Sequence, residues 1–351
     1  MKIIIFVLLV LFSFSFISSK EFKNDIQKFL QTKMPDVSVV GSLYSEFSKD
    51  ADKILNIKDI EVAFQGYIYP QLYSNVVFAF HNEEFNLEEA YLSFSGLYGF
   101  DFSFGRKFLS VGKVNKIHSH HLSYLEKPKF IKMFFAPDGL LGDGIEVGYL
   151  FPLEFFTKIN LGVYDLSEKP HLHNHLSNED SDFYLTGRSF FSKIWFSFPI
   201  RLTELELGLN YILSNGPYYL SHKDEISIYG LDLTLRYLIS TYKKIKFQTE
   251  IFSVVRQHHH GLDDTDHQVN KLGGYFFVEY KISSLWKIGL KYDFVEQILN
   301  GNYRCIDFII TRNLTEESYL RSQYRYEISY NNHIGFLQVV FGLGPHSHML
   351  E

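Results

Sequence analysis

Histidines gather in a few polar segments of the chain, between stretches that are mainly apolar. Imidazole nitrogens and carboxylate oxygens are ligands of Zn²⁺, Cu²⁺ and Ni²⁺ in proteins. Three segments hold such clusters, and two of them also carry aspartates and glutamates. The candidate metal ligands are His118, His120, His121, His171, His173, His175, His258, His259, His260, Asp263 and His267. These residues predict affinity for Zn²⁺ or another transition-metal ion.

The spacing of the histidines leaves two interpretations open. In an extended HLHNH segment, residues 171–175, the imidazoles point to one side but lie about 6.5 Å apart. One ion can hold them only if the loop bends or a second loop contributes a ligand. Neighbouring side chains in the HHH of 258–260 diverge further. The alternative is that these are solvated loop histidines with no ligand role.

Enzymatic chemistry has little support in the sequence. Ser119 stands between His118 and His120, but adjacency along the chain does not produce the geometry of a hydrolase triad. The sequence contains no Gly-rich phosphate loop and no cysteine-based metal motif. We therefore predict no catalytic residue, no bound organic cofactor and no enzyme activity.

Composition indicates which elements carry these segments. Aromatic residues make up 17% of the chain and charged residues 21%, while the mean hydropathy is −0.06. Strands that alternate lipid-facing and water-facing residues average to such a middling value. The net charge of −6, without a basic cluster, argues against a nucleic-acid partner. The single cysteine, Cys305, cannot close an internal disulfide.

The N-terminus predicts export. Residues 1–19 have the basic start, apolar core and small-residue end of a secretory signal peptide, the alternative being an N-terminal membrane anchor. Residues 20–36 space apolar side chains like a short amphipathic helix that lies in the periplasm or the lumen. Residues 37–351 are predicted to form the barrel described next.

Alternation of apolar and polar residues predicts strands over most of the chain. Phe100, Phe102 and Phe104 share one parity, while Asp101 and Ser103 share the other. About sixteen candidate strands follow, each long enough for a tilted crossing of roughly 9 to 11 residues. They lie near 37–48, 59–70, 72–83, 85–96, 99–112, 142–152, 155–166, 182–199, 202–216, 224–238, 241–257, 270–282, 284–297, 304–314, 315–328 and 331–345. The fold class is all-β, a transmembrane antiparallel up-and-down barrel.

The connections support the count, because short turns alternate with long or polar loops, as in outer-membrane barrels. The long connections at 113–141, 167–181, 217–223 and 258–269 all fall on the predicted outer side. Most histidines therefore belong to an outer mouth. A soluble β-sandwich is the alternative, but its solvent-facing positions would not carry this aromatic load.

The polar faces of the strands predict a charged lumen. Residues expected to line the pore are Glu61, Lys158, Glu204, Glu206, Lys287, Lys291, Asp293, Arg321 and Arg325. A water-filled barrel of this size passes small solutes. The alternative is a polar interior packed shut by the long loops or by the N-terminal helix.

Three stretches carry a family resemblance: GRKFLSVGKVNKIHSHHLSYLEKP, FFAPDGLLGDGIEVGYLFP and the closing FLQVVFGLGPHSH. In them the chain resembles bacterial outer-membrane proteins labelled zinc-regulated TonB-dependent receptors. The resemblance implies an outer-membrane location and a role in handling metal, especially zinc. The stretch before the first strand is too short for a plug domain, so a plug-less, porin-like barrel is expected.

Two functions follow from the sequence. The first is an outer-membrane channel that passes small hydrophilic solutes or metal ions through a histidine-rich mouth. The second is a closed barrel that acts as a metal-binding surface receptor or adhesin. Expected partners are outer-membrane lipid, small solutes or metal ions and, by similarity to sixteen-stranded porins, two further copies in a homotrimer.

Overall fold

The computed structural model describes residues 35–49, 52–81, 84–136, 138–166, 185–219, 222–258, 267–296 and 301–344. The predicted signal peptide and almost all of the predicted helix at 20–36 lie outside these ranges. So do six candidate metal ligands: His171, His173, His175, His259, His260 and Asp263. No helix within the described ranges is both long enough and apolar enough to span a membrane.

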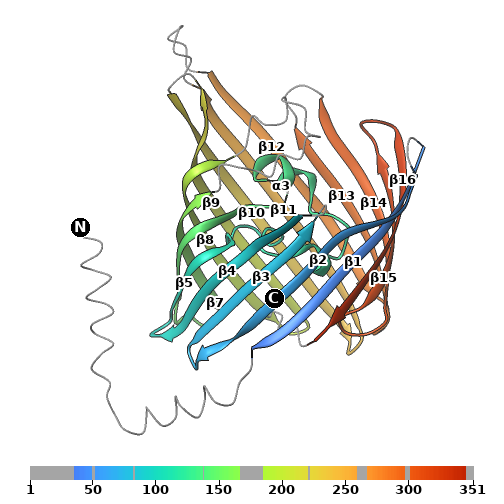
Figure 1. The fold of residues 1–351 in the computed structure, drawn as a ribbon, viewed down its shortest axis with the longest axis horizontal. Coiled ribbons are helices and arrows are strands. Elements are labelled where there is room, and N and C mark those ends of the chain that lie inside the picture. Colours follow the sequence, from blue (N-terminus) through green and yellow to red (C-terminus); the bar gives the residue numbers. More distant parts are fainter. Residues whose placement is uncertain are drawn as a thin grey trace, which may run out of the picture.

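Sixteen antiparallel strands close into one barrel, in which each strand pairs with its neighbours in sequence and β1 pairs with β16 (Figure 1). The strands are β1 (Asp36–Ser48), β2 (Asp52–Tyr69), β3 (Leu72–His81), β4 (Glu84–Leu97), β5 (Phe100–Phe108), β6 (Leu141–Leu150), β7 (Phe156–Leu166), β8 (Thr186–Ile200), β9 (Thr203–Tyr219), β10 (His222–Ser240), β11 (Lys243–His258), β12 (His267–Lys281), β13 (Trp286–Glu296), β14 (Asn302–Asn313), β15 (Tyr319–Glu327) and β16 (Asn332–Leu343). The predicted strand count, order and fold class are confirmed.

Alternation along each strand separates an apolar outer face from a polar inner face. In β13, Lys291 is fully buried, whereas the next residue toward the start of the strand, Leu290, is 54% exposed. This inversion of the usual pattern, with charges inside and leucines outside, is typical of a barrel that stands in lipid. The register then places charges of neighbouring strands opposite one another, since Lys291 pairs with Asp307 and Asp307 with Arg325.

Several strand ends differ from the sequence prediction, and two of the differences have a physical reason in the pairing or the backbone. β2 begins at Asp52 rather than at 59, because its pairing with β1 continues past two register shifts to Phe47 and Asp52. β5 ends at Phe108 rather than at 112, and Gly112 then adopts a positive φ of 60° that turns the chain.

Residues 109–140, here called the inner segment, connect β5 to β6 and contain the 3-10 helix η2 (Ser119–His121) and the helix α3 (Lys129–Phe134). Ser119 donates to Asp59 of β2, and the backbone N–H of Val114 donates to Glu250 of β11, 2.9 Å away. These two strands lie on opposite sides of the barrel. The inner segment therefore lies inside the barrel (Figure 1), and its predicted place in the outer mouth is wrong.

Candidate functional site inside the barrel

Asn115 closes the neck of the inner segment where the chain enters and leaves the barrel interior. Its fully buried side-chain amide donates to the carbonyl oxygens of Leu109 and Leu140, at 2.9 and 3.0 Å, and its oxygen accepts from the N–H of Leu140 at 2.6 Å. The backbone itself adds a bond from Leu109 to Leu140. One side chain thus substitutes for the strand pairing that ends at Phe108.

Helix α3 packs its apolar side chains against the wall formed by β11 and β12. The ring of Phe130 stacks on Phe252 and Tyr275 with centroid distances of 5.3 and 6.4 Å, and Phe135 meets Phe252 edge-on. Gly273 makes this approach feasible, because a Cβ at that position would lie 2.6 Å from the Cβ of Phe130. The barrel interior next to β11 and β12 therefore contains a packed apolar core.

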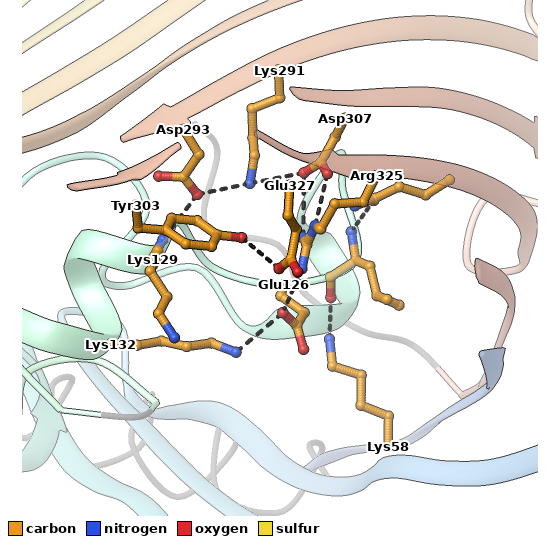
Figure 2. Close-up of polar contacts among 12 residues, drawn as sticks. Lys58, Glu126, Lys129, Lys132, Lys291, Asp293, Tyr303, Asp307, Arg325 and Glu327 are labelled. Atoms are coloured by element: carbon orange, nitrogen blue, oxygen red, sulfur yellow. Dashed lines mark hydrogen bonds and ion pairs between the residues drawn. The ribbon is translucent and has the colours of Figure 1, made fainter. Parts of the chain in front are cut away.

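A buried ionic network holds the inner segment to the adjoining strands β13, β14 and β15 (Figure 2). Lys291 lies 3.3 Å from both Asp293 and Asp307. Arg325 then binds Asp307 through two of its nitrogens, at 2.8 and 3.3 Å. Such charges remain ionised in the interior only when each has a partner of opposite sign.

The inner segment joins this network through Glu126. Its carboxylate lies 3.4 Å from Arg325 and 3.3 Å from Lys132. The pKa of Glu126 is lowered, chiefly by Lys132 and then by Arg325 and Lys58, which together outweigh the opposing effect of burial. The backbone N–H of Lys129 also donates to Asp293, at 2.9 Å.

A third set of contacts fastens the start of the inner segment to β8, β9 and β11. Lys113 forms an ion pair with Glu206, and Lys193 donates to the carbonyl oxygen of Gly112. The N–H of Gly112 in turn donates to Asn210, at 2.9 Å. With the bond from Val114 to Glu250, the segment is held on every side of the barrel.

Lys127 is a buried cation within the inner segment. Its ammonium donates to the backbone oxygens of Asn115 and Asp138, at 2.7 and 2.8 Å. Burial lowers the pKa of Lys127 to about 8, although Glu88, Asp138, Glu89 and Glu61 act in the opposite direction. The ammonium thus reinforces the neck, but burial makes its charged form unfavourable.

The fourth set of contacts is a group that we call the Glu–His cluster: Glu61 of β2, Glu88 and Glu89 of β4, and His118 of the inner segment. His118 Nδ1 lies 2.9 Å from Glu61 and 3.4 Å from Glu88, and its Nε2 lies 3.2 Å from Glu89. Burial alone would lower the pKa of His118, but Glu61 and Glu88 raise it well above its usual value.

Two β-bulges direct consecutive charged residues of the wall toward the inner segment. In β4 the register passes from Val77 opposite Glu89 to Phe78 opposite Leu87, so Glu88 is the extra residue. In β2 a similar shift makes Lys58 the extra residue next to Asp59. A regular strand would point neighbours to opposite faces, and a bulge re-aims one of them.

His120 and His121 lie beside the Glu–His cluster. His120 is 3% exposed and places its Nδ1 3.1 Å from Glu61. Its Nε2 lies 2.9 Å from Nε2 of His121. Three of the predicted ligands are thus brought together, although inside the barrel. His258 and His267 are partners in the backbone register of β11 and β12.

The predicted pore-lining residues face the interior, but most of them do not line open water. The residues that are at most 9% exposed are Glu61, Glu206, Lys291, Asp293, Arg321 and Arg325. The inner segment contacts several of them, so their role as the lining of a pore remains a proposal. Lys158, Glu204 and Lys287 remain partly exposed, toward the short-turn end of the barrel.

A row of lysines marks that end. Lys244 of β11 pairs in register with Lys281 of β12, which pairs with Lys287 of β13, and these three residues are here called the basic row. Lys246, two residues from Lys244, shares its face and reaches Ser123 of the inner segment at 3.2 Å. The basic row therefore faces the interior, below the inner segment. Like charges opposite one another are unfavourable in a sheet.

Sequence reasoning missed Asn115, Glu88, Glu89 and Glu250. Their roles depend on contacts with strands that are distant in sequence. One signal was present: the pairs Ile251–Phe252 and Phe276–Phe277 are apolar on both parities, which indicates that something apolar covers the inner face as well.

Comparison with known proteins gives the fold but not a family. No family model matches the chain. A protein of Aquifex aeolicus (strain VF5), described as uncharacterized, is 26% identical over 246 residues, which cover 65% of this chain and 51% of that protein. The chain thus spans about half the length of this relative.

Several solved structures of outer-membrane barrels are similar to this chain over most of its length. OmpT, an outer membrane protein of Vibrio cholerae in its trimer form, gives a TM-score of 0.59 at 11% identity, covering 88% of this chain and 99% of that one. An anion-selective porin from Comamonas acidovorans gives 0.59 at 11%, covering 89% and 99%. The channel DcaP of Acinetobacter baumannii gives 0.58 at 12%, covering 88% and 96%. At these identities the likeness shows a shared porin-like barrel fold.

Proposed function

We propose that this protein is an outer-membrane, porin-like channel for small hydrophilic solutes, narrowed by its inner segment. The observation that carries the proposal is the inner segment itself, fastened at four places inside a closed barrel of sixteen strands. Inner walls of charged residues suit a water-filled path, whereas the apolar outer face suits lipid. Export by the predicted signal peptide belongs to the same proposal.

The basic row supports a preference for anions. Lys244, Lys281 and Lys287 face the interior on three adjacent strands, with Glu279 as the nearby carboxylate and Lys246 3.8 Å from it. A lining of one sign raises the local concentration of ions of the other sign. We therefore expect small anions to enter from this end more readily than cations.

A closed barrel is the second candidate, because a specific observation favours it. Lys291, Asp307 and Asp232 are fully buried, and α3 adds an apolar core to the same interior. An interior packed in this way leaves little room beside the inner segment. In this candidate the barrel binds a ligand, and the segment is a permanent plug.

Conductance of the refolded protein in a planar bilayer tests these candidates. Steps of defined size, with a reversal potential in a KCl gradient that indicates anion preference, are expected from the channel. A silent bilayer, from protein shown to be folded and inserted, would refute the channel and leave the closed barrel. Replacing the three lysines of the basic row with glutamine should change the ion selectivity of the channel, measured as the reversal potential, without closing the channel.

Three expectations from the sequence remain proposals. Passage of metal ions such as zinc, and membership in the zinc-regulated receptors, have no support from the similar structures. A homotrimer is consistent with the trimer form of Vibrio cholerae OmpT. Chemical crosslinking of the purified protein in detergent tests the assembly directly.

A further inference from the structure

We infer that Glu61, Glu88 and His118 form a binding site for a divalent transition-metal ion, for which Zn²⁺ is the best match. Each residue offers one ligand atom, and these atoms lie within 4.8 Å of one another. A tetrahedral ion with bonds of about 2.0 Å holds its ligand atoms roughly 3.3 Å apart. The separations of 2.9 and 3.4 Å from His118 Nδ1 fall on either side of that value.

The surroundings of His118 are those of a metal ligand. Metal-bound histidines nearly always donate the other ring N–H to a carboxylate, a backbone carbonyl or a water, which fixes the orientation of the ring. Nε2 of His118 lies 3.2 Å from Glu89, and the ring packs edge-on against Phe108. Glu61 is oriented in the same way, because its second oxygen lies 3.1 Å from Nδ1 of His120.

The backbone also builds this site. The bulge at Glu88 is what allows Glu88 and Glu89 to act on the same histidine, one as a ligand and the other as its outer partner. Bulges occur often beside functional sites for this purpose. Three carboxylates around one imidazole form a negatively charged site that a divalent cation suits.

One nitrogen and two oxygen ligands indicate which ion is bound. Imidazole favours Zn²⁺ and its neighbours in the first transition series, whereas Mg²⁺ and Ca²⁺ prefer oxygen ligands alone. Three protein ligands leave a fourth position for water or a solute. A bound ion would join β2, β4 and the inner segment, and so hold η2 against the wall.

Zn²⁺ affinity of the untagged, folded protein in detergent, measured by competition with a chromogenic chelator, tests the inference. We expect one tight ion per chain. Loss of a residue that hydrogen-bonds to a metal ligand typically weakens metal binding by roughly 10- to 100-fold. Glu89→Gln should therefore weaken Zn²⁺ binding by a factor in that range. Glu88→Gln and His118→Asn should weaken it further. Co²⁺ absorption should change in all three variants, which a merely structural role would not produce.

The control is the triple substitution of His171, His173 and His175 by asparagine, which removes three imidazoles elsewhere in the chain. This variant should keep the tight ion. Loss of the ion in the triple variant, or affinity unchanged by both Glu88→Gln and His118→Asn, would overturn the inference, as would the absence of tight binding in the parent. A difference in gel migration between heated and unheated samples confirms that each variant is folded. The measurement requires no conduction, so a silent bilayer does not affect it.

Discussion

Asn115→Ala should release the inner segment from its neck without altering the barrel wall. The substitution removes three hydrogen bonds, to Leu109 and Leu140, from a fully buried side chain. Both carbonyl oxygens keep another partner, since Leu109 accepts from Val111 and Leu140 from Leu109. The N–H of Leu140 loses the partner described above. At about 1 kcal/mol for each of the two carbonyl bonds, plus about 1 kcal/mol for the orphaned N–H of Leu140, docking weakens by roughly 3 kcal/mol.

That loss corresponds to a shift of roughly two orders of magnitude in the docking equilibrium. Single-channel recording should therefore show a larger conductance state occupied about a hundred times more often than in the parent protein. Asn160→Ala is the matched control, because Asn160 donates to Glu146 within the barrel wall. If Asn115→Ala lowers the stability of the protein by the expected amount and leaves the conductance unchanged, the inner segment is not the narrowest point of the channel.

Three further predictions concern the packing, the titration and the selectivity of the interior. Gly273→Ala places a Cβ 2.6 Å from that of Phe130 and should lower the free energy of unfolding by about 1 to 3 kcal/mol. The control is Gly66→Ala, which should be tolerated because its Cβ would meet Pro35 at 3.6 Å. Equal effects of the two substitutions would contradict the packing of α3. The pKa of Lys127 is about 8 in the folded protein, below its unfolded value, so stability should rise with pH above 8, by at most about 1.4 kcal/mol per unit. Lys127→Met should abolish that part of the rise, and identical pH profiles of unfolding would refute it. Replacing Lys244, Lys281 and Lys287 with glutamine should move the reversal potential toward cation preference, while Lys243→Gln, on the other face of β11, should not; a shift in both would point to a general surface effect.

The barrel could be predicted from the sequence because its pattern is local. Alternation over nine residues, as in Phe100 to Phe108, determines both the strand and the face that each side chain occupies. Parity of the connections then determines the strand count. These signals require no knowledge of distant residues, so all sixteen strands were found near their observed positions.

The interior of the barrel could not be predicted in the same way. Whether residues 109–140 lie outside or inside depends on whether distant strands offer partners, such as Glu250 for Val114 and Gln323 for Leu125. The bulge at Glu88 is equally hidden, because it consists of a change in pairing register that composition does not record. Histidine clustering did identify His118, His120 and His121, but the acidic partners on β2 and β4 came from the fold.

The position of the inner segment in the chain affects how the barrel assembles. The inner segment precedes most of its partners in the chain, and some of its contacts join residues 199 positions apart, as between Leu122 and Arg321. Contacts of such long sequence separation are slow to form, because closing a long loop costs entropy. Because Arg325 of β15 completes the ionic network around Asp307, we expect the inner segment to dock only after β15 has paired with β14. The contacts of the segment with β2, β11 and β15 thus tie its docking to the pairing of strands that lie far apart in the sequence.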